Sequence, residues 1–588
     1  MKKINYLGTV LLAALTFVSC MDLDINVDPD SPTSTSGSVD TRLPALQFWM
    51  GHTHQTTGVF TALINQQITL SNRGDRYGSL AERSAANNTA STYAYQAFFV
   101  GTGGTLPDLY TMAEQEGAYH YMGVVKLFRA MGFMVMCDVY GEMPYTDALG
   151  AEINPVYDDG KTLFNGAMAE LDEAIGLFKQ TQEAGATPLS AGDIWNNGNV
   201  DKWIKLAYGM KARYLNNLSK KADLYNPDAI LEALDNAVKS NADNTVIHHE
   251  YSSSAVADHL WGDDIKSNYV YIWMMNWSRT YYVTKWYVDI LTDFDSKGIV
   301  DPRADKLVPS EQIKQGTEWL RTPGVDMRTA VRTGTNWRGP GTYNAETKKW
   351  EVTETTDSTV ISLQTKGIHS LSFRDVAEDG TILNSGTFYA RSDAPTHFLC
   401  YPEMCFIKAE VLFRKGDRDG AYAAYKEGIK AHTDLMNENL VDADENISKT
   451  KIPAADRDAY LNSAAIGTAS NLTLGKIMTQ KFIALTFSNQ NWNDMRRLDY
   501  GLAGGVAPGA YLGWEEPYEH ATAFVDLKWI PAGKQYRRLG YVSHEYNYNN
   551  ANLAASNQHA LEDDIRSYPV WWDCATDSEY YGYIGTQN

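Results

Sequence analysis

The sequence has few cysteines and lacks the common catalytic motifs. Only 5 of its 588 residues are cysteine, and no two form a Cys-x-x-Cys pair. This scarcity argues against a disulfide framework, and we expect Cys137, Cys400, Cys405 and Cys574 to be buried free thiols. The chain also has no HExxH, P-loop or GxSxG motif, which argues against the usual zinc-protease, nucleotide and serine-hydrolase sites.

Positive charge is also scarce. The chain carries 51 Lys and Arg against 72 Asp and Glu, a net charge of −21. A surface this acidic repels phosphate backbones and anionic lipid headgroups. We therefore expect no nucleic-acid partner.

Only one long apolar run is present, and it lies at the N-terminus. Two lysines precede an apolar run over residues 7–18, and the small residue Ser19 stands before Cys20. The run is too short to span a bilayer and has the layout of a signal peptide over residues 1–19. Ser19 and Cys20 together indicate a lipobox, so acyl chains on Cys20 would anchor the mature protein. A plain cleaved signal is the alternative.

The segment that follows is acidic and then rich in Pro, Ser and Thr. Asp22, Asp24 and Asp28 come directly after Cys20. Such residues form no packed core, so residues 20–40 are predicted to be a lipidated N-terminus and flexible linker.

Apolar residues recur at helical spacing over much of the remaining chain. At residues 405–429 the pattern also alternates small and bulky residues as in a tetratricopeptide repeat. The residues at those positions are Ala409, Leu412, Ala421, Tyr425 and Gly428. Helices are predicted at 43–70, 115–139, 162–178, 200–218, 229–238 and 471–487, and from 402 onward. A single pair cannot bury its own face, and the candidates for neighbouring pairs are 115–137 with 162–178, and 200–218 with 229–238.

Between residues 251 and 395 the helical pattern breaks up, with Gly, Thr and Trp in irregular order. We therefore predict a fold dominated by α-helices, in which tetratricopeptide-like pairs form a scaffold for a long, loop-rich insertion. The predicted division is a helical scaffold over 41–250, an irregular insertion over 251–395 on the ligand side, and helical repeats with an irregular tail over 396–588.

No residue cluster has good metal-ligand spacing. Two histidine pairs point to different sides of a helix or are adjacent, which suits satisfied histidines better than ligands. The pairs are His52 with His54, and His248 with His249. The acidic segments 22–30 and 442–446 lack the glycine and distal glutamate of an EF-hand loop. We expect no cofactor, with loose structural Ca²⁺ binding at these acids as the alternative to solvated loops.

Charges also cluster near residue 496. Arg496 and Arg497 stand beside Asp494 and Asp499. We interpret this group as a structural ion-pair cluster and not as a ligand site.

Seven segments in order resemble the SusD/RagB family of surface nutrient-binding lipoproteins. They are DINVDPDSPT (24–33), DVYGEMPYTDAL (138–149), YDDGKTLFNGAMAELDEAI (157–175), GNVDKWIKLAYGMKARYLNNLS (198–219), YPEMCFIKAEVLFRKGD (401–417), QNWNDMRRLDYG (490–501) and RRLGYVSHEYNYNNAN (537–552). The chain departs from the family at Tyr208, where Asn is frequent, and at Val542, where Pro is frequent.

The resemblance implies a helical protein with four tetratricopeptide-like pairs cradling an irregular domain, and no known reaction. It also implies a lipid anchor on the extracellular face of the outer membrane, for which the acids after Cys20 resemble the export signal. The expected partners are an oligosaccharide and a SusC-like TonB-dependent transporter, over which the protein acts as a lid.

The richest candidate for ligand contact is the aromatic segment 268–286. Trp273, Trp277 and Tyr281 are four residues apart, so on a helix they present their rings on one face. Sugar rings expose apolar C–H faces that stack on such rings. The alternative is that these aromatics merely cap the helix pairs.

A second candidate is residues 71–78, with Trp337 in a Gly-rich loop as a third. Charged and amide side chains in 71–78 offer hydrogen bonds to hydroxyls, and its tyrosine offers a stacking face. These residues are Asn72, Arg73, Asp75, Arg76 and Tyr77. A solvated turn is the alternative.

Taken together, the sequence predicts a non-enzymatic surface protein that captures oligosaccharide and delivers it to the transporter. One alternative keeps the scaffold but binds peptide or another nutrient. The other is a surface glycoside hydrolase, which needs two opposed carboxyl groups across a cleft.

Overall fold

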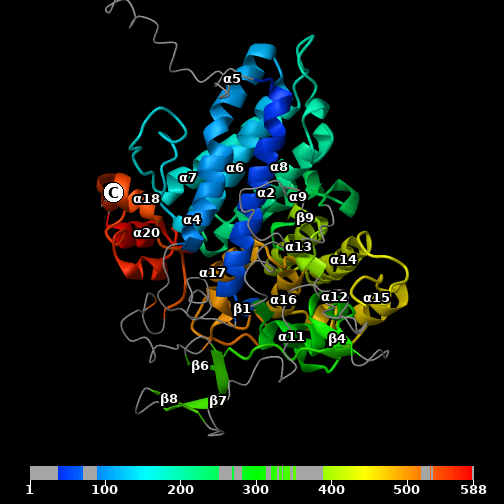
Figure 1. Ribbon diagram of the computed structural model, residues 1–588. Helices are drawn as coiled ribbons and strands as arrows, with labels where there is room; N and C mark the ends of the chain where they lie inside the picture. The colour runs from blue at the N-terminus through cyan, green and yellow to red at the C-terminus, as the bar shows by residue number, and fades with distance from the viewer. Residues whose placement is uncertain are drawn as a thin grey trace, which may run out of the picture.

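The computed structural model describes residues 37–70, 89–249, 268–270, 281–312, 319–327, 330–333, 336–344, 349–352, 388–517, 530 and 534–585. This part of the chain consists mainly of helices, with strands only in two- and three-stranded sheets (Figure 1). The predicted fold class is therefore confirmed. Within these ranges, no helix combines the length and apolar character that crossing a membrane requires.

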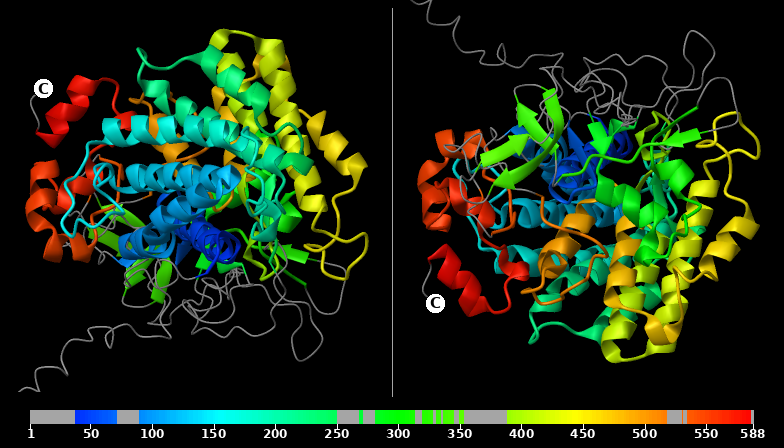
Figure 2. Two further views of the ribbon diagram at one scale, coloured as in Figure 1. Left: turned by 90° about the horizontal axis from the view of Figure 1, so that it is seen from above. Right: turned by 90° about the horizontal axis from the view of Figure 1, so that it is seen from below.

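The N-terminal half is built from long helices that lie side by side (Figure 2). They are α2 (Val39–Ile64), α4 (Thr89–Gln96), the π-helix η2 (Ala97–Thr102), α5 (Leu106–Glu116), α6 (Tyr119–Tyr140), α7 (Gly160–Phe178), α8 (Val200–Asn217) and α9 (Pro227–Asn236). The carboxylate of Asp159 accepts the backbone N–H of Thr162 at 2.8 Å and starts α7. Gly117, with φ 67°, ends α5. The predicted single helix 115–139 is therefore divided, because a left-handed glycine separates α5 from α6.

The C-terminal half adds shorter helices. They are α13 (Tyr401–Lys415), α14 (Arg418–Asn437), α15 (Ala454–Leu461), α16 (Leu474–Ala484), α17 (Asn489–Arg497), α18 (Ser543–Tyr548), α19 (Asn550–Ser556) and α20 (Asp577–Ile584). Gly416, with φ 85°, ends α13, and the Asp417 carboxylate caps α14. The predicted helix 471–487 is observed as α16, which is shorter at both ends. Helix α17 packs against α2 and so joins the two halves.

The predicted helix pairs are confirmed. Helix α6 packs on α7, α8 on α9, and α13 on α14. Small residues permit the close approach: a Cβ on Gly123 would lie 2.8 Å from the Phe178 ring, and one on Gly428 would lie 2.8 Å from the Phe406 ring. Of the tetratricopeptide positions, Ala409, Ala421 and Tyr425 are fully buried, whereas Leu412 is only partly buried.

Short strands surround these helices, and several pair over long distances in sequence. They are β1 (Ile68–Leu70), β2 (Thr245–Ile247), β3 (Tyr281–Val283), β4 (Ser310–Gln312), β5 (Trp319–Arg321), β6 (Ala330–Thr333), β7 (Asn336–Asn344), β8 (Lys349–Val352) and β9 (Thr396–Leu399). Strand β1 pairs with β3, β2 with β9, β4 with β5, and β7 with both β6 and β8, all antiparallel.

Two predictions about secondary structure are wrong in part. The predicted helix 43–70 ends at Ile64, because Gln66 takes a left-handed conformation with φ 63° and the chain continues as β1. The predicted irregular region 251–395 contains helices α11 (Lys285–Thr292) and α12 (Ala304–Leu307) besides its strands. The hydroxyl of Thr284 accepts the N–H of Tyr287 and caps α11.

Candidate functional site

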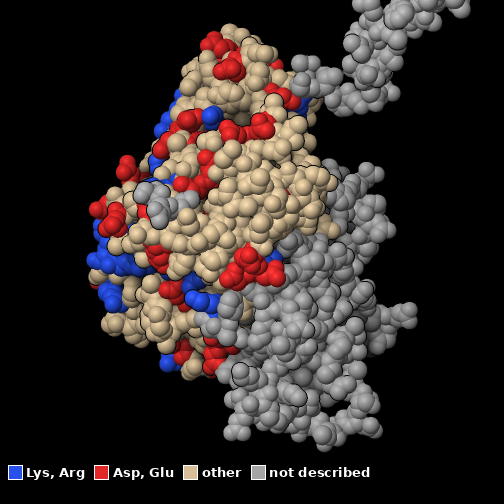
Figure 3. All heavy atoms as spheres, turned by 90° about the vertical axis from the view of Figure 1, so that its left-hand side faces the viewer, with Lys and Arg blue, Asp and Glu red and all other residues tan. Residues whose placement is uncertain are grey.

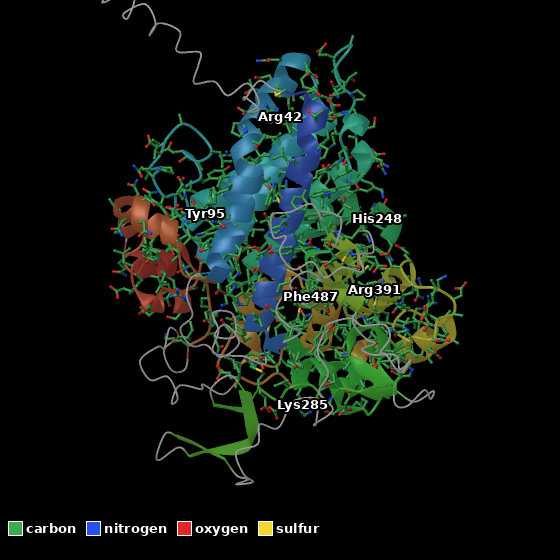
Figure 4. All side chains as sticks on the ribbon, in the orientation of Figure 1. Arg42, Tyr95, His248, Lys285, Arg391 and Phe487 are labelled. Carbon is green, nitrogen blue, oxygen red and sulfur yellow. The ribbon has the colours of Figure 1, made fainter. Side chains whose placement is uncertain are left out.

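A partly enclosed cavity lies between α2, β9, α13 and the connection from α16 to α17. It has a volume of about 60 Å³. Figure 4 labels Phe487, a lining residue on that connection, beside the lower part of α2. The polar lining residues include His54, Gln55, Arg213, Asn268, Thr396, His397, Glu403, Thr486 and Ser488.

Thr396, at the start of β9, holds the wall of this cavity together. Its hydroxyl accepts hydrogen bonds from the side-chain amides of Gln55 and of Asn268, the latter at 3.4 Å. Asn268 is bound further, because its amide donates to the Ala394 carbonyl at 2.8 Å. The backbone N–H of Tyr269 donates to Gln55 at 3.2 Å. The beginning of the aromatic segment 268–286 is therefore fixed to α2 and to β9 at the cavity.

The one ion pair that lines the cavity is fully matched. Arg213 makes a bidentate contact to Glu403, with Nε–Oε1 at 2.7 Å and Nη2–Oε2 at 2.5 Å, and also donates to the Phe398 carbonyl at 2.8 Å. Burial opposes the charged form of Arg213, but the adjacent Glu403 carboxylate outweighs it and raises the pKa of the guanidinium. The pair therefore presents no net charge to the cavity.

The histidines near the cavity are neutral. Burial lowers the pKa of His52 and of His54 to about 3, and that of His397 to about 4. His52 and His54 face different partners on α2: the His52 ring lies 3.8 Å from the ring of Tyr269, and the His54 ring lies 5.0 Å from that of Phe398. The prediction that these two histidines do not share a ligand is confirmed.

The cavity alone is too small for a sugar ring. Since a buried water occupies about 10–15 Å³ measured this way, the cavity has room for a few water molecules. Its uncharged hydroxyl, amide and imidazole groups both donate and accept hydrogen bonds. This arrangement suits water or the hydroxyl groups of a larger ligand that lies over the cavity mouth.

Phe487 shows where the backbone at the cavity is constrained. It adopts a left-handed conformation with φ 62°, which is unfavourable for a bulky residue. Its N–H donates to Gln67 at 3.0 Å. Gly58 of α2 permits this geometry, because a Cβ there would lie 1.8 Å from the Phe487 carbonyl oxygen.

A series of aromatic rings runs along α2 to the cavity. The Phe48 and Trp49 rings are 5.2 Å apart, those of Trp49 and His52 are 5.3 Å apart, and His52 lies against Tyr269. Phe48 and Trp49 are partly exposed, whereas His52 and Tyr269 are buried. We call Phe48, Trp49, His52 and Tyr269 the α2 ring series. It joins the outer face of α2 to the start of the aromatic segment.

The structure places only two of the predicted ligand residues. Tyr281 is 1% exposed and lies in β3 opposite Leu70. It is therefore not part of a helical face shared with Trp273 and Trp277, because pairing with β1 makes it extended. Trp337 lies in β7 opposite Arg332, and its side chain is outside the description. The remaining candidates lie outside the described residues: Trp273, Trp277, Asn72, Arg73, Asp75, Arg76, Tyr77 and the lipidation site Cys20.

Sequence reasoning missed the α2 contribution to this site. Residues 52–57, HTHQTT, are polar although they lie within a long helix, and Thr53, Gln55, Thr56 and Thr57 are buried. Buried polar side chains need partners. A polar run inside an otherwise apolar helix was the available signal.

The charges near residue 496 form the predicted structural cluster. Arg497 contacts Glu410 at 2.6 Å and Asp494 at 2.8 Å, and Lys481 contacts Asp494 at 2.8 Å. All four side chains are at most 2% exposed. Arg496 instead donates to backbone carbonyls of neighbouring segments. The cluster joins α13, α16 and α17 and does not face the cavity. The four cysteines after Cys20 are also buried and free, as predicted.

In the part of the chain that the structure describes, no three His, Cys, Asp or Glu side chains come together to hold a metal. In the acidic segment 442–446, Asp442 pairs with Lys451 at 2.8 Å and Asp444 accepts the N–H of Asn446 at 2.7 Å. These oxygens are used within the loop.

Comparisons with known proteins agree with this architecture. The SusD-like family, described as starch-binding and associating with the outer membrane, matches residues 50–510. A SusD/RagB family protein from Bacteroides thetaiotaomicron superposes with a TM-score of 0.63 at 17% identity, covering 92% of this chain and 100% of that one. A protein described as chitin-binding gives 0.63 at 20%, covering 91% and 100%. A chitin-binding SusD homologue from Flavobacterium johnsoniae gives 0.56 at 16%, covering 92% and 97%.

No curated protein sequence matches the chain. The family match nevertheless spans most of its length, and the shared fold covers about nine-tenths of it. The resemblance of the seven segments is thus confirmed, and the chain belongs to the SusD-like family.

Proposed function

We propose that this protein captures oligosaccharide at the cell surface and delivers it to a SusC-like TonB-dependent transporter in the outer membrane, acting as its lid. The observation that carries the proposal is the α2 ring series, which leads from a partly exposed helix face to a neutral, polar cavity. Rings stack on the C–H faces of sugars, and neutral donors and acceptors match their hydroxyls.

The family match and the relatives support a glycan as the cargo. The family is described as starch-binding, and two of the similar structures are of proteins described as chitin-binding. The aromatic segment with Trp273 and Trp277 begins at Asn268, whose backbone and side chain are fixed at the cavity. We propose that these two tryptophans extend the α2 ring series into a stacking platform.

Binding without reaction is part of the proposal. Glycoside hydrolysis uses two carboxyl groups on opposite sides of the bond that is cut, about 5–9.5 Å apart. Among the described residues that line the cavity, Glu403 is the single carboxylate, and it is engaged by Arg213.

Replacing both Trp273 and Trp277 by alanine is expected to weaken glycan binding about ten- to a hundredfold, because each lost stacking contact contributes about 0.5–1.5 kcal/mol. Affinity electrophoresis in gels containing starch or soluble chitin measures the loss. The control replaces two partly exposed tyrosines away from the cavity, Tyr110→Ala with Tyr119→Ala, and should bind as the native protein does.

Undiminished retention of the tryptophan variant in both gels would remove the platform. Chain-shortening of maltooligosaccharides or chitooligosaccharides by the native protein, followed over hours, would instead establish a hydrolase. Tight binding of a peptide mixture without any glycan binding would favour the peptide alternative.

The proposed lipid anchor makes a separate prediction about Cys20. In cells grown with labelled palmitate, the Cys20→Ala protein should carry no label and should leave the membrane fraction, since acyl chains supply the anchoring free energy. Cys405→Ala, which alters a buried thiol, should remain labelled and membrane-bound. Equal labelling of both variants would contradict an anchor at Cys20.

A further inference from the structure

An exposed apolar surface lies on the side of the molecule formed by α18, α19 and the loop between α6 and α7 (Figure 1). Ile153 is 87% exposed, Tyr548 is 76% exposed and Val156 is 59% exposed. We call these three residues the apolar knob. Isolated apolar residues are ordinary at protein surfaces, but a group of large ones on one face marks an interaction site.

Hydrogen bonds hold the knob together. On the helix side, the amide of Asn549 donates to the Pro155 carbonyl at 3.0 Å, and that of Asn552 donates to the Asn154 carbonyl at 2.9 Å. The Tyr157 hydroxyl donates to Glu545 at 2.6 Å. These bonds fix the loop across α18 and α19.

The spacing along the chain brings Tyr548 to the same place. Glu545, Asn549 and Asn552 all contact the loop. Tyr548 lies three residues after Glu545 and four before Asn552, which puts it on the helix face beside the loop residues. Ile153 and Val156 flank the two bound carbonyls. The knob is therefore held exposed by a rigid framework, which lowers the entropy that a partner must overcome on binding.

The charge around the knob selects the partner. Residues 141–160 and 539–565 together contain nine Asp and Glu and no Lys or Arg. Exposed acids such as Glu152, Glu562 and Asp563 surround the knob. Figure 3 shows this side of the molecule, with a broad uncharged area and Asp and Glu side chains at its borders. An acidic border repels anionic lipid headgroups and nucleic acid and attracts a surface that carries Lys and Arg.

We infer that the apolar knob docks this protein onto its transporter, in an apolar pocket of the extracellular loops that is bordered by basic residues. This inference rests on the delivery role proposed above. It assigns the docking to a surface separate from the α2 ring series and the cavity, so the two contacts are testable independently.

The test is recovery of the transporter with the full-length, affinity-tagged lipoprotein from detergent-solubilised outer membranes. Ile153→Asp with Tyr548→Asp places charge on the knob and should lower the recovered transporter at least about tenfold, while retention in glycan gels stays unchanged. The matched control is Ile194→Asp with Val441→Asp, at residues that are 55% and 51% exposed on other surfaces. It should recover the native amount.

A milder pair, Ile153→Ser with Tyr548→Ser, guards against misfolding of the aspartate variant and should lose recovery to a smaller extent. Reversal of the border with Glu152→Lys and Asp563→Lys should also reduce recovery. Native recovery by both knob variants overturns the docking surface alone. Loss of glycan retention with intact transporter recovery also overturns it, because the knob would then be a glycan contact. If the native protein recovers no barrel transporter, the proposed delivery role fails and the docking inference fails with it.

Discussion

Replacing Arg497 with methionine is expected to lower the free energy of unfolding by about 3–5 kcal/mol, because the change leaves buried carboxylates without their partner. Arg497 contacts both oxygens of Glu410 at 2.6 Å and also Asp494, at a site with no exposure for Arg497 or Glu410. Burial raises the pKa of Glu410, but the Arg497 charge outweighs it and holds that pKa well below its usual range. The loss is measured by urea unfolding at pH 7.

The pH dependence of this variant has a definite sign. In the native protein the lowered pKa of Glu410 contributes stability at neutral pH, which is lost only when the pH falls below the ordinary glutamate range. Without Arg497, burial raises the pKa of Glu410, so its folded state favours the protonated carboxyl. The stability deficit of the variant should therefore shrink as the pH is lowered from 7 towards 5. A deficit that stays constant would contradict this account.

Two further variants serve as controls for Arg497→Met. Combining it with Glu410→Leu removes the unpaired carboxylate and should recover much of the lost stability. Lys285→Met breaks the Lys285–Asp289 pair, whose side chains are 51% and 49% exposed. Because exposed pairs contribute little, this change should alter stability by less than about 1 kcal/mol.

A second large effect is expected at Gly58. Gly58→Ala should destabilise the fold by about 3 kcal/mol, because its Cβ would lie 1.8 Å from the carbonyl oxygen of Phe487, where backbone atoms cannot move aside cheaply. The comparison is Gly176→Ala, also inside a helix but with nothing within 4 Å of the added Cβ. That change should stabilise by about 0.5–1 kcal/mol, since alanine favours helix.

Thermal unfolding of the two alanine variants side by side gives the measurement. Opposite signs are the expected result. If both variants are equally stable, the contact between α2 and the connection from α16 to α17 is looser than the geometry indicates. Glycan retention provides a second readout, because Gly58→Ala displaces Phe487 at the cavity, whereas Gly176→Ala does not.

The helical scaffold was predictable because its signals are local. Helix α7 was predicted to within two residues from its apolar spacing, and α8 to within one. The pairing of α6 with α7 followed from small residues at contacts such as Gly123 with Phe178. Caps and left-handed glycines mark the ends, and Gly117 divides α5 from α6 in a way that apolar periodicity alone does not reveal.

The site was less predictable because its contacts join distant parts of the sequence. Tyr281 pairs with Leu70, more than two hundred residues earlier, and this pairing makes it a buried strand residue. Thr396 binds Gln55 and Asn268 although nothing near it in sequence signals that role. By contrast, the ion-pair role of Arg497 was predictable, since Asp494 is one helical turn away.

The pairing of β2 with β9 has a consequence for how new specificity arises in this scaffold. Ile247 lies opposite Thr396, so the chain departs from the helical scaffold and returns to it at neighbouring points. Lengthening or shortening the intervening stretch therefore need not alter the spacing of the helix pairs. Recombination between relatives can exchange this stretch as a cassette, which allows the cargo to change while the framework is inherited intact.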